Sequence, residues 1–425
     1  MSNKSEKKTM TEERKYQLKP KLRFPAFRGA PGWEEKSLEK LCTINPSSEV
    51  LPESFYYIDL ESVAAGELTV KNRIDRNTAP SRAQRLLKKG DIIYQVVRPY
   101  QRNNLFFDFD EKDNYVASTG YAQLRATGSE KFLYHAIHTD GFVSKVIAKC
   151  TGSNYPAINS SDLSGIRLAV PPTIDEAQKV GECLTSLDEL ITAHGQKLDE
   201  LQAHKKGLMQ GLFPREGETI PRIRFPEFVN ERGWRKKEIG DVLIEVSRPV
   251  EMKDEDEYSL VIVKRRYGGI ISRGRFLGKA IKVKSQFLLE TDDFLISKRQ
   301  IVHCACGLIS GEFQGSIVSN EYSVLRARNG LNIKFFDYFS QQPSVSKSFL
   351  ECSVGIVIEK MLFRIEDWMK REFFFPTIRE QQKISDCLTS IDQLITARSR
   401  KLDALKAHKI GLMQQLFPPA EEVEA

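Results

Sequence analysis

The stretch that decides the fold is Pro172–Pro214, with the sequence PTIDEAQKVGECLTSLDELITAHGQKLDELQAHKKGLMQGLFP. An almost identical stretch, PTIREQQKISDCLTSIDQLITARSRKLDALKAHKIGLMQQLFP, occupies Pro376–Pro418. Of the 43 paired positions, 29 carry the same residue, which is far beyond chance and indicates an internal duplication. We therefore interpret the chain as two copies of one unit.

Both stretches have the pattern of a long helix with a marked start. Thr173 lies three residues before Glu176, which predicts a capping box, and Thr377 has the same position in the second copy. Apolar residues then recur at alternating spacings of four and three, the a and d positions of a coiled coil. We expect the two helices to pack antiparallel, because each leaves its own domain and the domains would otherwise collide. The predicted helix-pair interface comprises Val180, Leu184, Leu187, Ile191, Leu198, Leu201, Ile384, Leu388, Ile391, Ile395, Leu402 and Leu405.

Polar residues interrupt this apolar seam at equivalent places: His194 and Lys205 in the first stretch, Arg398 and Lys409 in the second. Such residues either fix the register of a helix pair at some cost in stability or extend their charged ends out of an imperfect seam. About 36 residues at 1.5 Å each make a helix of ~54 Å. That length would hold two domains more than one DNA turn apart, about 34–36 Å.

A second repeated motif marks the start of each copy. Arg-Phe-Pro-x-Phe with a following tryptophan spans Arg23–Trp33 and recurs at Arg224–Trp234. A chain of 425 residues is too long for one core, so at least two domains are expected. The predicted boundaries are a flexible tail over 1–20, a first domain over 21–171, a helix over 172–213, a linker over 214–221, a second domain over 222–375, a helix over 376–418 and a tail over 419–425.

Between the matched motifs the two copies share little. The β-type pattern predicts strands over Phe55–Leu60, Asp91–Val97, Tyr258–Val263 and Asp293–Ser297, and helices are predicted over Lys131–Lys149 and Lys334–Leu350. The expected fold class is α+β, with two mixed α/β domains joined by two long antiparallel coiled-coil helices in a pseudo-two-fold repeat. A duplicated scaffold with two different recognition regions, and a duplicated fold with neutral loop drift, both give this pattern.

Positive charge is concentrated in the variable regions, beyond what the net charge of +7 requires. Lys71 to Asn104 carry nine Lys or Arg against two acidic residues, and Ser259 to Gln300 carry ten against three. Two basic clusters at corresponding places favour nucleic-acid binding. Arg can bind guanine and Asn or Gln adenine, whereas Lys mostly contacts phosphate. The predicted DNA-binding residues are Arg98, Tyr100, Gln101, Arg102, Asn103, Ser153, Asn154, Tyr155, Lys264, Arg265, Arg266, Tyr267, Lys298, Arg299 and Gln300. A solvated surface is the alternative interpretation for any one of them.

No catalytic motif is predicted, so the chain is not expected to be an enzyme. Asn45-Pro46-Ser47 lacks the second proline and the aromatic residue of an adenine methyltransferase loop. Gly274–Ala280 is one residue short of a phosphate-binding loop and ends in alanine where Ser or Thr should hold magnesium. No carboxylates form a persuasive nuclease arrangement.

Metal binding and membrane insertion are not predicted either. Cys304 and Cys306 follow His303, but no further Cys or His pair completes a zinc site, so a buried strand is the simpler interpretation. The seven cysteines are scattered, which suits a reducing cytoplasm. The sequence contains no stretch of ~18 apolar residues such as a membrane span needs.

Taken together, these features resemble the specificity subunits of type I restriction–modification systems. The resemblance rests on the two variable domains, the Arg-Phe-Pro-x-Phe motifs, and the Pro-x-x-x-Glu-Gln helix start at Pro376, Glu380 and Gln381. The first copy departs from the last motif at Ala177. The resemblance covers about residues 20–418, and its architecture is more specific than any single motif.

The resemblance implies that each domain is a target recognition domain for one half of a split, asymmetric DNA site. It implies that the helices fix the spacer and dock two modification subunits, which methylate adenine with S-adenosylmethionine. Two restriction subunits would add ATP- and Mg-dependent translocation and cleavage, while this chain would hold no cofactor. A cytoplasmic location follows. Two alternatives remain: a free-standing regulator that binds bipartite DNA, and a nuclease with an unrecognised site.

Overall fold

The computed structural model describes residues 18–47, 50–109 and 112–419. The predicted tails over 1–20 and 419–425 lie outside these residues, except for residues 18–20 and 419. The chain divides into two compact units, Met1–Gly195 with Arg400–Ala425 and Gln196–Ser399. Each unit therefore contains one mixed α/β domain and halves of both long helices.

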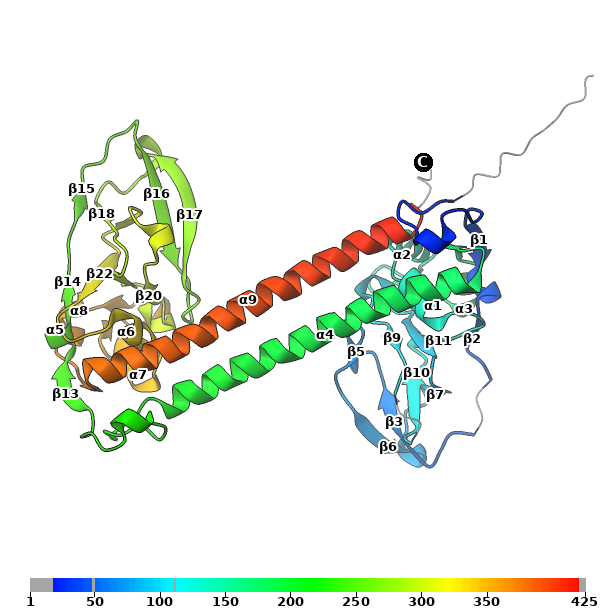
Figure 1. The fold of residues 1–425 in the computed structure, drawn as a ribbon, viewed down its shortest axis with the longest axis horizontal. Coiled ribbons are helices and arrows are strands. Elements are labelled where there is room, and N and C mark those ends of the chain that lie inside the picture. Colours follow the sequence, from blue (N-terminus) through cyan, green and yellow to red (C-terminus); the bar gives the residue numbers. More distant parts are fainter. Residues whose placement is uncertain (1–17, 48–49, 110–111, 420–425) are drawn as a thin grey trace, which may run out of the picture. The chain divides into compact units, whose positions relative to one another are not determined.

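The two long helices are α4 (Ile174–Gly211) and α9 (Ile378–Leu416), which confirms both predicted helices (Figure 1). Thr173 Oγ1 accepts a hydrogen bond from the Glu176 amide at 3.3 Å, and Thr377 does the same for the Glu380 amide at 3.4 Å. The second half of each predicted capping box is wrong. The two glutamates bind arginines far away in the sequence instead, as described below.

Within each unit, halves of α4 and α9 are joined by an ion pair. In the first unit Lys409 Nζ lies 2.5 Å from Asp188 Oδ1, and in the second Lys205 Nζ lies 2.6 Å from Asp392 Oδ1. The two lysines that interrupt the seam thus have carboxylate partners. The predicted seam residues are all buried or half-buried.

The first unit contains two four-stranded sheets and two short pairs. One sheet has the order β2-β11-β8-β9 and is antiparallel throughout, and the other has the order β6-β3-β10-β7 with β3 and β10 parallel. The two short pairs, β1 with β12 and β4 with β5, are both antiparallel. The strands are β1 (Glu34–Ser37), β2 (Cys42–Ile44), β3 (Ser54–Ile58), β4 (Val63–Ala64), β5 (Glu67–Leu68), β6 (Asn72–Asp75), β7 (Ala83–Leu86), β8 (Ile92–Gln95), β9 (Leu105–Phe106), β10 (Tyr115–Ser118), β11 (Tyr121–Ala126) and β12 (Arg167–Val170).

The second unit repeats this topology. Its sheet β14-β22-β19-β20 corresponds to the first antiparallel sheet, and β15-β18-β21-β16-β17 is the mixed sheet with one added strand. The pair β13 and β25 corresponds to β1 and β12. The strands are β13 (Arg235–Glu238), β14 (Leu243–Glu245), β15 (Pro249–Val250), β16 (Glu257–Val263), β17 (Ile270–Leu277), β18 (Gln286–Leu288), β19 (Phe294–Ser297), β20 (Cys306–Leu308), β21 (Ile317–Ser319), β22 (Tyr322–Ala327), β23 (Ser353–Val354), β24 (Leu362–Phe363) and β25 (Glu372–Phe375).

All four predicted strands are present, as β3, β8, β16 and β19, but each predicted helix of the variable regions is two helices. The first is broken into α1 (Glu130–Ala136) and α2 (Asp140–Ala148), because Thr139 caps a new helix by accepting from the Phe142 amide. The second is broken into α6 (Ile333–Ser340) and α7 (Pro343–Glu351), because Pro343 has no amide hydrogen to continue α6. The remaining helices are α3 (Ser160–Ser164), α5 (Ile239–Val242) and α8 (Ile365–Met369).

Each unit's core is completed by residues at the C-terminal end of a long helix. In the first unit Leu416 and Phe417, at the end of α9, are buried with Trp33, whose ring centroid lies 5.9 Å from that of Phe417. In the second unit Leu212 and Phe213, at the end of α4, are buried in the core that contains Trp234. The repeated Leu-Phe-Pro sequence is therefore a core element as well as a helix end.

A buried ion pair links the start of each domain to the start of its helix. Arg23 donates from Nε to Glu176 Oε1 at 2.7 Å and from its terminal nitrogen to Oε2 at 2.6 Å. The Trp33 indole also donates to Glu176 Oε1, at 3.1 Å. Arg224 binds Glu380 in the same two-point way at 2.8 Å. This contact explains why the Arg-Phe-Pro motif and the helix start recur together. No helix in the part of the chain described is long and apolar enough to cross a membrane.

Candidate nucleic-acid interface

In the first unit, a tight loop follows β8 and carries the predicted recognition residues. Arg98 and Arg102 both have left-handed backbone conformations, with φ of 55°, and enclose the short turn Pro99–Gln101. The Arg98 amide donates to the Pro156 carbonyl at 2.7 Å, which holds this loop against the segment that contains Tyr155. The guanidinium of Arg98 lies over the Tyr155 ring, 4.2 Å from its centroid.

This loop forms one wall of a cleft of about 1180 Å³. Four predicted residues line the cleft: Arg98, Gln101, Asn103 and Tyr155. The buried Nε of Arg98 has no hydrogen-bond partner among the described residues, and the Tyr155 ring is exposed. An arginine that stacks on an exposed aromatic ring at a cleft can bind a base edge or a phosphate.

Other predicted residues of this loop are bound within the protein. Arg102 forms an ion pair with Asp140 at 2.6 Å and donates to the His138 carbonyl. Gln101 accepts from Gln95 at 2.8 Å. These contacts position the loop, and the structure assigns Arg102 a framework contact that the sequence did not reveal. The remaining predicted residues are exposed: Tyr100, Ser153 and Asn154.

Several residues of the cleft were not identified as candidates from the sequence. Glu61, Ser81, Arg82 and Thr119 also line the cleft, from loops next to β4, β7 and β10. Of these, Arg82 was recognisable in the sequence as part of the basic cluster. The other three have no distinguishing sequence pattern, because only the folded sheet brings them together.

In the second unit, the predicted DNA-binding residues lie on two loops that contact each other. Arg265 donates to Gln300 Oε1 at 2.7 Å, and the Arg266 amide donates to the His303 carbonyl at 2.7 Å. Lys264 and Arg266 have exposed side chains. The loop after β16 and the loop after β19 therefore form a single surface.

Three predicted residues of this surface are held by partners in the second unit. The Tyr267 hydroxyl donates to the Ser340 carbonyl at 2.9 Å, and burial raises its pKa, so that it remains a donor. Arg299 forms an ion pair with Glu321, and Lys298 donates to the Asn320 carbonyl at 3.1 Å. Tyr267 is thus tied to the core, whereas the exposed Arg299 pair can be exchanged for a phosphate.

The buried carboxylates of the two units are neutralised by arginines. Asp91, at the start of β8, accepts two hydrogen bonds from Arg125 at 2.8 Å. Its counterpart Asp293 is bound by Arg248 and Arg326. These pairs stabilise the sheets and leave no acidic pair free for metal-dependent hydrolysis at these two positions.

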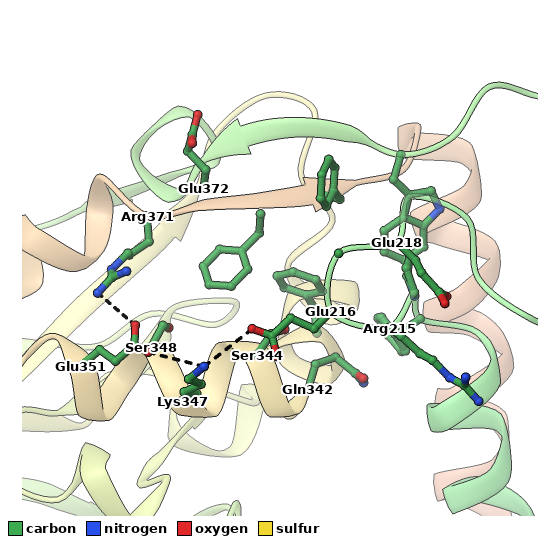
Figure 2. A pocket seen from close by; sticks show the side chains of 17 residues that line it. Arg215, Glu216, Glu218, Gln342, Ser344, Lys347, Ser348, Glu351, Arg371 and Glu372 are labelled. Atoms are coloured by element: carbon green, nitrogen blue, oxygen red, sulfur yellow. Dashed lines mark ion pairs between the residues drawn. The ribbon is translucent and has the colours of Figure 1, made fainter.

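A pocket of about 230 Å³ in the second unit lies between the segment after α4 and the surface of α7 and β25 (Figure 2). Four of its charged side chains pair with each other. Lys347 lies 3.7 Å from Glu216, and Arg371 lies 3.0 Å from Glu351 (Figure 2). The pocket is therefore part of the contact between the linker that follows α4 and the second domain.

The His303 segment does not gather metal ligands. Cys306 is buried in the core, where burial raises the pKa of its thiol, and His303 lies 3.2 Å from Glu359. Over the described residues, no three His, Cys, Asp or Glu side chains are grouped so that they would hold a metal ion.

The chain is similar to specificity subunits of type I restriction–modification systems. Residues 31–203 match a family described as type I restriction modification DNA specificity domain. The HindI specificity subunit of a type I restriction enzyme from Haemophilus influenzae is 29% identical over 139 residues, which is 32% of this chain. That match covers 30% of the relative, so the chain matches less than a third of its length.

Two solved structures have a similar fold. The S subunit of a type I restriction–modification system from M. genitalium aligns with a TM-score of 0.61 at 14% identity, covering 95% of this chain and all of that one. A structure from a study of complex assembly and conformational transition of the type I R-M system gives 0.51 at 20% identity, covering 92% of this chain and 98% of that one. At these identities the likeness concerns the fold alone.

Proposed function

We infer that this chain, of which residues 31–203 match the type I restriction modification DNA specificity domain, belongs to that family and is the DNA-recognising subunit of a type I restriction–modification complex. One observation carries the proposal. Strands β8 and β19 have the same place in sheets of the same order, but different polar loops follow them. Two scaffolds of one topology with different side chains at the same position suit recognition of two different half-sites.

Within each half-site, the predicted side chains that are not tied into the interior of their unit would make the contacts. In the first unit these are Arg98 and Tyr155, with Ser153 and Asn154 beside them. In the second unit, Lys264, Arg265, Arg266 and Gln300 would contact DNA, with Lys298 and Arg299 toward phosphates. Arg102 and Tyr267 would support the two loops from inside.

The proposal includes partners that supply the chemistry. Two modification subunits, with S-adenosylmethionine, would methylate adenine in each half-site, and two restriction subunits would use ATP and Mg to translocate and cleave. The long helices would set the spacer and dock the modification subunits. The chain itself would be non-catalytic and would act in the cytoplasm.

The test is single-molecule sequencing of adenine methylation in a host with this gene and in the same host after its deletion. The expected result is loss of methylation from one split motif with a fixed gap. A variant with Arg98→Ala should lose this methylation, whereas Lys145→Ala, an exposed residue of α2 paired with Glu35, should retain it. An unchanged methylation pattern in the deletion strain, with the modification subunits expressed, would refute the proposal.

The two alternatives give different outcomes in the same strains. A free-standing regulator would bind bipartite DNA without any effect on methylation. A nuclease would cleave DNA as a purified chain with Mg, without partners. Binding and cleavage assays on the isolated chain distinguish these cases.

A further inference from the structure

The second unit carries an exposed apolar tip, Ile356–Ile358, between β23 and β24. Ile356 is fully exposed, and Val357 and Ile358 are each about half exposed. In the described ranges 18–47, 50–109 and 112–419, no other three consecutive large apolar side chains are all exposed. Single exposed apolar residues are ordinary, but a contiguous group on a loop marks a surface that something covers.

The apolar tip is held in a defined position. β23 and β24 pair antiparallel, with Ser353 opposite Phe363. The loop closes tightly, because a Cβ atom on Gly355 would lie 2.9 Å from the Met361 Cα. The Lys360 amide donates to the Val357 carbonyl at 2.8 Å. Ile356–Ile358 therefore sit on a folded hairpin.

The hairpin is attached to the residues proposed to recognise bases. Glu359, next to the apolar tip, lies 2.9 Å from Arg265 and 3.2 Å from His303. The Phe363 amide donates to the Lys298 carbonyl at 3.0 Å. The apolar tip thus adjoins a surface with two cations, Arg265 and Lys298, and the amide of Gln300, which are side chains that can bind phosphates and base edges.

The first unit has a polar loop at the same place in the topology. The segment Gly152–Tyr155 follows α2 as the hairpin follows α7, and its Tyr155 stacks on Arg98 at the cleft. Both loops therefore lie beside the loop that follows the equivalent strand, β8 or β19. The first unit presents Ser, Asn and Tyr there, and the second unit presents Ile, Val and Ile.

We propose that Ile356 and Val357 contact thymine methyl groups in the half-site bound by the second unit; this inference rests on the proposed function. The thymine methyl is the apolar group that base pairs present in the major groove. Arg265 and Gln300 beside it carry the donors and acceptors that recognise guanine and adenine. A basic surface with one apolar tip thus matches a groove edge that contains thymine.

The experiment compares thymine with deoxyuridine, which lacks only the methyl group. The full chain, assembled with its modification subunits, is titrated with duplexes of its methylated motif in which each thymine in turn is replaced by deoxyuridine. Loss of one methyl contact should weaken binding about fourfold, the factor for ~0.8 kcal/mol per buried carbon. The loss is expected at one or two thymines, all in the same half-site.

The variants complete the test. Ile356→Ser and Val357→Ser should bind the thymine duplex about fourfold more weakly and should no longer distinguish it from deoxyuridine. Leu350→Ser, at an apolar position on α7 about as exposed as Val357, should bind like the unmodified chain. Unchanged thermal unfolding of the variants would confirm that they fold.

Three results would overturn the proposal. The first is no effect of deoxyuridine at any thymine, although the duplex itself binds. The second is an equal loss of the variants on both duplexes. The third is a variant that no longer assembles with the modification subunits, which would make the apolar tip a protein-docking surface. Failure of the unmodified chain to bind any split motif would instead refute the proposed function.

Discussion

Replacing Glu176 by alanine should destabilise the first unit strongly. The Glu176 side chain is 1% exposed and accepts two hydrogen bonds from Arg23, which is 10% exposed, and one from Trp33. Removing one partner of a buried ion pair leaves an uncompensated charge, which typically costs 3–5 kcal/mol, about the upper end of single-substitution effects. For a unit of this size, about 2–4 °C per kcal/mol corresponds to a fall in melting temperature of roughly 6–20 °C.

The assay is urea and thermal unfolding, followed by hydrogen exchange that reports each segment separately. Exchange should accelerate around residues 22–33 and at the start of α4. Glu380→Ala should have the same effect on the second unit, since Arg224 and Glu380 are 6% and 1% exposed. Lys145→Ala breaks an exposed pair with Glu35 and should cost less than about 1 kcal/mol. A loss below about 1 kcal/mol for Glu176→Ala would refute this account of the repeated motif.

Three further results are expected. Burial lowers the pKa of His138 from 6.5 to about 4, so the unfolded chain binds the proton first as the pH falls; this histidine should cost the first unit on the order of 2 kcal/mol of stability between pH 8 and pH 5. Burial also lowers the pKa of His135 in the same unit, so His138→Gln should reduce the pH dependence and leave the part due to His135. The Asp188–Lys409 pair, a quarter to a third exposed, should give a coupling energy of about 1 kcal/mol in a double-mutant cycle. Arg98→Ala should weaken binding to one half-site by about 1–3 kcal/mol. Arg102→Ala should instead lower the stability of the first unit.

Each of these results has a control. His408→Gln, at an exposed site on α9, should leave the pH dependence as it was. The exposed Lys197–Glu200 pair of α4 should show a smaller coupling than Asp188 with Lys409. Equal weakening by Arg98→Ala on specific and unrelated DNA would point to phosphate contact and would contradict base recognition.

The parts of the fold that depend on local sequence were predictable. The heptad seam and the Thr-capped starts predicted α4 and α9, and alternating apolar residues predicted β3, β8, β16 and β19. The breaks at Thr139 and Pro343 had local signals too, since one residue caps a helix and the other cannot continue one. Strand order was not predictable, because it depends on pairing between distant segments.

The candidate site was predictable by region but not by residue. Basic composition indicated the loops after β8 and β19. It could not show that Arg102 binds Asp140 or that Tyr267 points into the core, since both partners are distant in sequence. Glu176 shows the same limit. Its local pattern predicts a capping box, but a guanidinium 153 residues away is a stronger partner than a backbone amide.

The closure of the first core by Leu416 and Phe417 has a consequence for the order of synthesis. The ribosome makes Trp33 and Phe132 early, yet the residues that cover them are made almost last. The domain that is synthesised first is thus completed last. Its apolar surface stays uncovered while more than half of the chain is translated. The second domain has no such delay, because Leu212 and Phe213 precede it. A chain that stops before α9 ends would therefore lose the stability of the domain made first.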